Sequence, residues 1–275
     1  MALDEIGDWS EMKLAIIRDY APAYTRIVGS AKRRFHHVYV DAFAGYGLDV
    51  SRSTGKLVGG SPTIALQTIP RFAEYFLIDL DGARTASLRT LAGGDPSVHV
   101  REGDCNQILL DDVFPLLGFE DYVRALCFLD PYGLNLDREV VRRAGHLRTV
   151  DLFVNFPVMD ANRNVLWQRP EGVSDKQKAR LDRWWGDRSW EEIVYNKQTS
   201  LFGEPALIKG EANAIVRGYR QRLKDVAGFA HVPIPIPMKN SRDNNLYWLF
   251  FASHNATGAR IVNEIFEKYA RRARR

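Results

Sequence analysis

The chain has 275 residues, of which 45% are hydrophobic and 26% are charged. A chain of this length hides about three quarters of its unfolded surface, so its core needs neither disulfides nor metal. No apolar run approaches the roughly 20 residues of a membrane-spanning helix. Residues 1–10 resemble neither a signal peptide nor a transit peptide. These features exclude disordered, fibrous and membrane-spanning proteins, and we expect a cytoplasmic protein without membrane contact.

The net charge of +4 does not describe the body of the protein. Four C-terminal arginines account for it, so nucleic-acid binding cannot be argued from net charge, and we expect a solvated helix end. These are Arg271, Arg272, Arg274 and Arg275. The chain has two cysteines, Cys105 and Cys127, and six histidines without HxxxH or HExxH spacing. We therefore expect reduced, packed thiols and no metal site.

The first half of the chain alternates helical and strand patterns. Apolar residues recur at helical spacing from residue 10, and short apolar runs are each stopped by glycine, proline or aspartate. Such alternation predicts a Rossmann-like α/β fold, a mostly parallel sheet with helices on both faces. The predicted helices are 10–29, 61–71, 82–92, 106–118 and 136–147, and the predicted strands are 38–44, 75–79, 97–101, 125–130 and 150–156.

The pattern changes after residue 157. Residues 158–207 hold four of the six tryptophans, many charges and no clear strand, so we interpret them as an insertion or cap. A helix is predicted at 208–226, and 230–238 is extended with alternate prolines, as on an edge strand. An antiparallel last strand at 246–253 and a helix at 257–270 close the chain. Residues 1–157 and 208–275 then form one α/β domain.

Candidate polar groups lie within or after successive strands of the first half. Asp41 is followed by Gly45 and Gly47, and the next three strands end in aspartates. Those aspartates are Asp79, Asp104 and Asp130. Right-handed crossovers bring the carboxyl ends of parallel strands to one edge, where α/β sheets bind their ligands. The sequence therefore predicts a binding site at this edge.

The glycine turn indicates the kind of ligand. A dinucleotide fingerprint needs a third small residue, where this chain has Val50, and needs a helix N-terminus for the pyrophosphate. The next helix start, Ser61-Pro62, lies well beyond the glycines. This argues against a nicotinamide dehydrogenase. A cofactor with ribose and adenine but no phosphate fits better, and S-adenosylmethionine is such a cofactor.

The segment Asp41-Ala42-Phe43-Ala44-Gly45-Tyr46-Gly47 resembles motif I of class I S-adenosylmethionine-dependent methyltransferases. The resemblance implies that Asp41, Phe43, Gly45 and Gly47 form the turn beside the cofactor's amino-acid part. Asp79 would accept hydrogen bonds from the ribose hydroxyls, and Asp104 from the adenine amine. The structural alternatives are a plain tight turn, an N-cap at Asp79 and a helix cap at Asp104.

The tetrapeptide Asp130-Pro131-Tyr132-Gly133 follows the fourth strand. Pro131 favours an extended Asp130, whose acceptors then face the site beside the flat ring of Tyr132. The tetrapeptide resembles the Asp/Asn-Pro-Pro-Tyr/Phe motif of amino-methylating enzymes, without the second proline. It is closer to the Asp-Pro-Phe/Tyr-Gly of tRNA guanine-N2 dimethyltransferases. Asp130, Pro131 and Tyr132 are therefore the predicted catalytic residues; an ordinary turn is the alternative.

Over most of its length the chain resembles the three-Cys-motif partner (TcmP) family. The resemblance rests on Lys13 and Tyr20, the segments 40–47, 60–66, 76–79 and 128–133, Asp104 with Asn106, 154–156, and 246–254. Many members of the family have Glu at the position of Asp79. The family resembles methyltransferases and accompanies a three-Cys-motif protein that itself looks like a radical S-adenosylmethionine enzyme.

The prediction is methyl transfer from S-adenosylmethionine to an exocyclic amine or similar nitrogen, on a substrate such as a nucleobase or nucleic acid. Lys13, Tyr46 and Asn155 are assigned to the substrate side, although Asn155 could equally be a buried turn residue. The rival function is a cofactor- or nucleoside-binding partner of the three-Cys-motif protein. Two segments stay open: the glycine-rich loop 46–60 is a lid or a surface insertion, and the tryptophans at 184–190 stack on a base or form a core.

Overall fold

The computed structural model describes residues 3–30, 35–199, 205–211, 213–240 and 242–272. No helix in these ranges is long and apolar enough to cross a bilayer. No group of three or more His, Cys, Asp or Glu side chains in the same ranges could hold a metal ion. Arg271 and Arg272 are exposed at the end of the last helix, whereas Arg274 and Arg275 lie outside the described residues.

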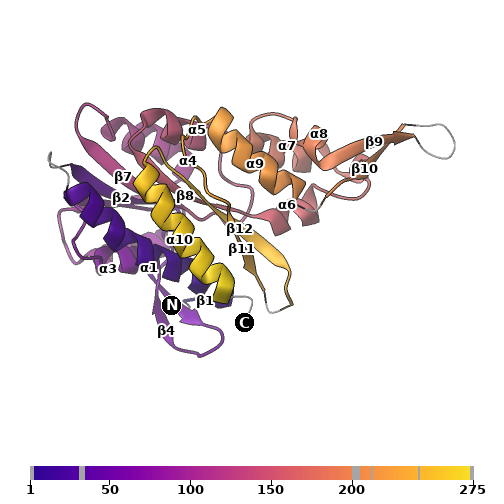
Figure 1. The fold of residues 1–275 in the computed structure, drawn as a ribbon. Helices are drawn as coiled ribbons and strands as arrows, with labels where there is room; N and C mark the ends of the chain where they lie inside the picture. Colours follow the sequence, from indigo (N-terminus) through magenta and orange to yellow (C-terminus); the bar gives the residue numbers. More distant parts are fainter. Residues whose placement is uncertain (1–2, 31–34, 200–204, 212, 241, 273–275) are drawn as a thin grey trace.

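A seven-stranded sheet runs through the molecule (Figure 1). Its first five strands in chain order are parallel, and β12 runs antiparallel to both of its neighbours. This is a Rossmann-like class I arrangement, and it confirms the predicted fold. Across the sheet the strands are β6 (Val98–Glu102), β5 (Glu74–Asp79), β2 (His36–Asp41), β7 (Val123–Leu129), β8 (Val150–Phe156), β12 (Asn245–Ala252) and β11 (Ile236–Lys239).

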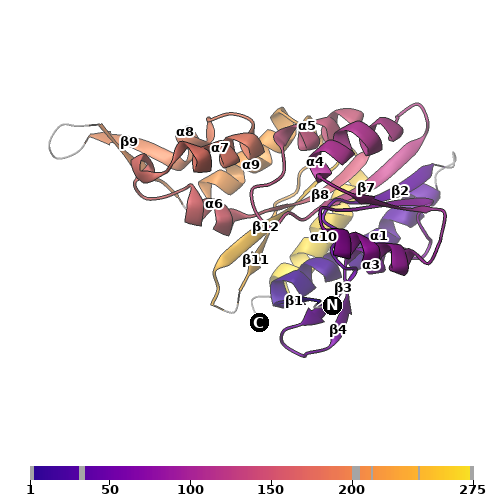
Figure 2. The ribbon, with the colours of Figure 1, turned by 180° about the vertical axis from the view of Figure 1, so that it is seen from behind.

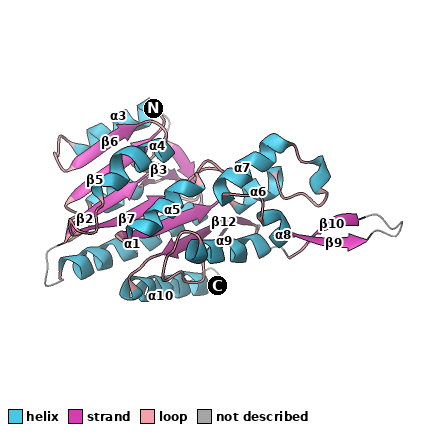
Figure 3. Ribbon diagram, turned by 90° about the horizontal axis from the view of Figure 1, so that it is seen from above, coloured by secondary structure: helices cyan, strands magenta, loops and turns pink. Residues whose placement is uncertain are grey.

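Helices cover both faces of the sheet, because strand residues alternate between two apolar clusters. Val38 and Val40 pack into one cluster, and Tyr39 into the other. The second cluster contains α1 (Asp8–Gly29), α2 (Ser61–Leu66), α3 (Gly82–Ala92) and α10 (Ala256–Arg272). The first contains α4 (Cys105–Ile108), α5 (Arg138–Leu147) and α9 (Ala214–Asp225). Figure 3 shows the sheet between these two layers.

Three predicted helices are shorter than expected. The helix predicted at 61–71 ends at Leu66, and that predicted at 208–226 begins at Ala214. The one predicted at 106–118 is α4 followed by a π-helical turn (Leu109–Val113) and a 3₁₀ turn (Phe114–Leu116). Pro115 lies in that last turn and lacks the backbone N–H that a continuing helix would need.

The glycine-rich loop 46–60 forms β3 (Leu48–Ser51) and β4 (Leu57–Gly59), and we call residues 46–60 the flap. The flap strands make a small sheet with β1 (Asp4–Ile6), which pairs in parallel with β3. In Figure 2 this small sheet projects beyond the central sheet near the N-terminus. The N-terminal segment and the flap are thus joined by main-chain pairing.

Three of the four tryptophans of 158–207 belong to the core of the molecule, whereas Trp167 is 40% exposed. Trp184, Trp185 and Trp190 are at most 2% exposed, and Trp184 lies 5.5 Å from the ring of Phe156 at the end of β8. Burying one large aromatic side chain contributes about 1.5–3 kcal/mol. The structure therefore supports the core interpretation of these tryptophans over base stacking. They are carried by α7 (Asp175–Trp185) and α8 (Trp190–Val194), after α6 (Val158–Asn164) and a 3₁₀ turn (Pro170–Gly172).

The expectation that 158–207 contains no strand is wrong. β9 (Tyr195–Thr199) and β10 (Pro205–Lys209) pair as an antiparallel ribbon. The ribbon projects from the body (Figures 1 and 3). The adjacent apolar residues Leu207 and Ile208 of β10 are both exposed, so this part of the ribbon lacks the alternation that marks a half-buried strand.

Candidate functional site

Asp79 ends β5 and is only 6% exposed. Its Oδ2 accepts from the backbone N–H of Gly45 at 2.9 Å, and its Oδ1 accepts from the N–H of Asp81 at 3.0 Å. Helix α3 is capped by Asp81, which accepts from the N–H groups of Ala83 and Arg84. The N-cap alternative for Asp79 is therefore wrong. Each oxygen of Asp79 keeps a lone pair for a further donor.

The two glycines of the turn have different tasks. Both have positive φ, 63° at Gly45 and 78° at Gly47, which explains the residue type. A Cβ on Gly45 would meet no atom within 4 Å, whereas one on Gly47 would lie 2.7 Å from the side chain of Leu91. Gly47 also accepts from Thr63 through its carbonyl. Gly45 thus faces open space, and Gly47 packs inside the protein.

Asp41 lies behind the turn and is fully buried. Its carboxylate accepts from the N–H of Phe43 at 3.3 Å and from the hydroxyl of Tyr39 at 3.2 Å. Burial raises the pKa of Asp41 to about 7, although hydrogen bonds from Ser61 and Phe43 oppose this rise. The structure does not bring this carboxylate to the surface of the site. Asp41 acts on the site by fixing the backbone around Phe43.

Asp104 caps α4, as its structural alternative predicts, by accepting from the N–H of Asn106 at 2.8 Å. Its exposed carboxylate also lines the Asp79 cavity, and its predicted role toward an adenine amine stays a prediction. Asn106 has a role that the sequence analysis missed. Its side chain donates to the carbonyl of Asn135 and accepts from the N–H of Asp137, which ties α4 to the segment after the Asp130 turn.

Asp130 follows β7, and its carboxylate is held by two side chains. Lys13 of α1 forms an ion pair with Oδ2, and Asn155 of β8 donates to Oδ1 at 2.8 Å. Lys13 is 7% exposed and Asn155 is 1% exposed. The structure therefore brings together three residues that the sequence analysis selected separately. Asn155 is buried as well as linked to the site, and it acts through Asp130.

The insertion supports the same turn through Asp160 of α6. Its Oδ2 accepts from the N–H of Leu134 at 3.0 Å and pairs with Arg180 of α7 at 2.7 Å. A Cβ on Gly133 would lie 2.9 Å from that oxygen, so the close approach explains the glycine. The sequence analysis missed Asp160 and Arg180, because nothing in the sequence pairs the insertion with this turn.

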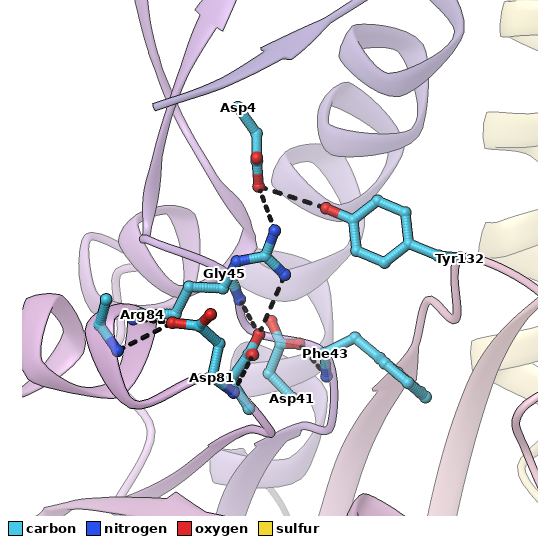
Figure 4. A network of polar contacts seen from close by, with 9 residues as sticks. Asp4, Asp41, Phe43, Gly45, Asp81, Arg84 and Tyr132 are labelled. Atoms are coloured by element: carbon cyan, nitrogen blue, oxygen red, sulfur yellow. Dashed lines mark hydrogen bonds and ion pairs between the residues drawn. The ribbon is translucent and has the colours of Figure 1, made fainter. Parts of the chain in front are cut away.

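Arg84 of α3 is a further residue that the sequence analysis missed. Its guanidinium bonds Asp4 at 2.9 Å and lies 3.8 Å from Asp79. The rings of Tyr46 and Tyr132 are each 5.5 Å from it, in cation–π range. Figure 4 shows Arg84 between Asp4 and the glycine turn. The hydroxyl of Tyr132 also donates to Asp4, at 3.2 Å. A surface-type arginine on a helix gives no sequence signal for this role.

Two cavities lie side by side at the carboxyl edge of the sheet and share the walls Phe43 and Tyr132. The Asp79 cavity has a volume of about 480 Å³, and the Asp130 cavity one of about 290 Å³. The first is lined by Ala42, Phe43, 79–81, Arg84, 103–106, Tyr132, Asn135 and Arg183. The second is lined by 4–7, 9–10, 13–14, 43–45, Asp49, 60–61, 130–132 and Tyr247.

Of the predicted residues, Phe43, Gly45, Asp79, Asp104, Lys13, Asp130, Pro131 and Tyr132 line a cavity. Asp41, Gly47, Tyr46 and Asn155 do not, and they contact residues of the cavity walls or the turn instead. Cys105 and Cys127 are free and buried, and burial raises the pKa of both thiols above the ordinary range. A thiol with a raised pKa is a poor nucleophile, although Cys105 borders the Asp79 cavity.

No family model and no curated protein matches this sequence. Among solved structures, protein LPL1258 from Legionella pneumophila is 12% identical, with 91% of this chain and 90% of that chain covered and a TM-score of 0.49. An S-adenosylmethionine-dependent methyltransferase from Clostridium acetobutylicum is 10% identical, with coverage of 87% and 91% and a TM-score of 0.42. TYW2 of M. jannaschii, in complex with AdoMet, is 8% identical, with coverage of 89% and 74% and a TM-score of 0.36.

Proposed function

We propose that the protein transfers a methyl group from S-adenosylmethionine to an exocyclic amine or similar nitrogen. The observation that carries the proposal is the pair of adjoining cavities. One cavity holds Asp79 and the other holds Asp130, and they meet at Phe43 and Tyr132. A ligand with an adenosine half and an amino-acid half matches two cavities in a row. Its methyl group would then lie on the side of Asp130.

The residues present suit this cofactor. Asp79 keeps lone pairs for the ribose hydroxyls, and the exposed carboxylate of Asp104 can accept from the adenine amine. Gly45 leaves open space at the junction of the cavities. The positive sulfonium and ammonium groups would lie in the Asp130 cavity, where carboxylates outnumber cations. Its carboxylates are Asp4, Glu5, Asp49 and Asp130, against the single cation Lys13.

When bound, S-adenosylmethionine supplies a methyl group already activated by the sulfonium. The protein must mainly hold the acceptor nitrogen in line with it, an effect that can supply roughly 7–11 kcal/mol. Asp130 is suited to this task because Lys13 and Asn155 fix its carboxylate while lone pairs remain for an acceptor N–H. Tyr132 is 66% exposed at the shared wall, where its ring can support a planar acceptor.

The proposal also includes a partner protein and a class of acceptor, and both come from sequence resemblance. The sequence resemblance to the three-Cys-motif partner family suggests a three-Cys-motif protein as partner, and the Asp130-Pro131-Tyr132-Gly133 resemblance suggests a nucleobase as acceptor. The carboxylate of Asp130, held by Lys13 and Asn155 and still partly exposed to the cavity, favours an enzyme over a protein that only binds the cofactor, because cofactor binding alone does not require a restrained carboxylate at this place.

The first experiment is mass spectrometry of the purified protein, to detect co-purified S-adenosylmethionine or S-adenosylhomocysteine. The second measures S-adenosylhomocysteine release with a panel of nucleic acids and metabolites from the host cell. We expect cofactor binding and acceptor-dependent release. Cofactor binding without release across the panel would instead support a binding partner of the three-Cys-motif protein, and absence of cofactor binding would overturn the proposal.

A further inference from the structure

The Asp130 cavity contains a carboxylate to which the account above gives no role beyond its charge. Asp49 lies on β3 of the flap and lines this cavity together with Lys13 and Asp130. Asp130 is held by Lys13 and Asn155, and Asp4 is held by Arg84 and Tyr132. Asp49 makes no side-chain hydrogen bond or ion pair with any residue in the described ranges. It is therefore the carboxylate of this cavity that remains available to a ligand.

The surroundings of Asp49 place its carboxylate beside Gly60 and raise its pKa. A Cβ on Gly60, which also lines the cavity, would lie 3.3 Å from its Oδ2. Asp4 is its register partner across the parallel pair β1–β3. Burial, followed by the charge of Asp4, raises the pKa of Asp49 to about 6; Asp130 raises it further, and Lys13 and Arg84 oppose the rise. Glu5, paired with Arg52, is the remaining carboxylate of the lining.

We propose that Asp49 is the base that receives the proton of the acceptor nitrogen, while Asp130 orients that nitrogen. This rests on the proposed methyl transfer. The nitrogen uses its lone pair to form the new bond to the methyl carbon, and the carbon–sulfur bond breaks with its electron pair staying on sulfur. The nitrogen then carries one positive charge, which it loses as a proton to the carboxylate of Asp49. No further reactant is required.

The assignment narrows the substrate class. An acceptor that needs a base carries at least one N–H, so a primary or secondary amine fits and a ring nitrogen without hydrogen does not. The same cavity disfavours an anionic group beside the reacting nitrogen. Asp4, Asp49 and Asp130 line the cavity, and Lys13 is the single cation of its lining. The acceptor is therefore an amine that is neutral or cationic around the reacting atom.

Sinefungin tests the position of Asp49 without any acceptor. It is an S-adenosylhomocysteine analogue in which a carbon bearing a primary amine replaces the sulfur, so its ammonium stands where the methyl group would be. Calorimetry gives the affinity of sinefungin relative to S-adenosylhomocysteine for the wild type and for Asp49→Asn. We expect the substitution to lower this ratio by about tenfold or more, the scale of one charge-assisted hydrogen bond. The affinity for S-adenosylhomocysteine should fall much less than that for sinefungin, and retained binding of S-adenosylhomocysteine shows that the variant is folded.

The pH dependence of the wild type gives a second measurement that needs no variant. Because Asp49 ionises around pH 6, the preference for sinefungin should increase as the pH rises from 5 to 7. Asp225→Asn is the matched control, since Asp225 is exposed on α9 and bonds only Gln221 among the described residues. An unchanged ratio in Asp49→Asn, or an equal loss of both analogues, would overturn the proposal. If neither analogue binds the wild type, the proposed function itself fails.

Discussion

The two cavities at the sheet edge are built in different ways. Most of the Asp79 cavity comes from residues at or just after β2, β5 and β6, the first three strands of the central sheet in chain order. The Asp130 cavity combines β1, α1, the flap, the turn after β7 and Tyr247 of β12. A cavity made at successive strand ends depends on the topology of the fold. A cavity assembled from distant segments can vary without changing the sheet, which suits the part of a site that selects the acceptor.

The largest expected effect distinguishes the chemistry of the two cavities. Asp130→Ala removes the carboxylate that orients the acceptor, so turnover should fall by roughly 10²–10⁴ while cofactor affinity stays within about threefold. The measurement is S-adenosylhomocysteine release beside calorimetry with the cofactor. Loss of cofactor binding would show that Asp130 binds the cofactor and not the acceptor. Normal turnover would show that Asp130-Pro131-Tyr132-Gly133 is only a structural turn. Lys13 would be left without its partner, so the melting temperature of the variant is the control.

Much of the Asp79 cavity could be predicted from sequence, because Gly45, Asp79 and Asp104 stand at regular places after consecutive strands. The Asp130 cavity could be predicted only in part. Asp130 is predicted from its place after a strand and Lys13 from the family resemblance, but Asp4, Asp49 and Arg84 are not predicted, because their contacts depend on β1 pairing with the flap. Local spacing carries no information on that pairing. The projecting ribbon β9–β10 was missed because its apolar residues Leu207 and Ile208 are adjacent and both exposed, without the alternation of a half-buried strand.

A pair of glycine substitutions separates binding from stability. Gly45→Ala and Gly47→Ala both place a side chain at positive φ, which costs roughly 1 kcal/mol of stability. Gly47→Ala should cost more than Gly45→Ala, because its Cβ would lie 2.7 Å from Leu91. We expect the free energy of unfolding of Gly47→Ala to fall by about 1–3 kcal/mol in total. Gly45→Ala should chiefly weaken cofactor binding, because its Cβ enters open space. Denaturant unfolding and calorimetry measure the two effects, and equal unfolding free energies in both variants would contradict the assignment.

The next expected effect concerns the buried carboxyl behind the turn. Burial raises the pKa of Asp41 from 3.8 to about 7, so between these values the folded protein binds a proton that the unfolded chain has released. The contribution of Asp41 to stability is therefore present at low pH and lost as the pH rises from about 4 to about 7. Asp41→Asn should reduce this loss, measured as melting temperature at pH 5 and pH 7. Asp151 lies near the start of β8, and burial raises its pKa to about 6, so it should keep its own contribution in that variant.

Calorimetric titration with S-adenosylmethionine tests the central claim most directly, that one cofactor occupies both cavities through Asp79. The wild type should bind one molecule per chain. Asp79→Ala should weaken binding by about 1–3 kcal/mol, since hydroxyls that lose a carboxylate partner stay unpaired in a buried place. Asp81→Ala is the matched control, because Asp81 caps α3 without receiving the ribose in this account. Absence of binding to the wild type, or equal affinity in the wild type and Asp79→Ala, would contradict the claim.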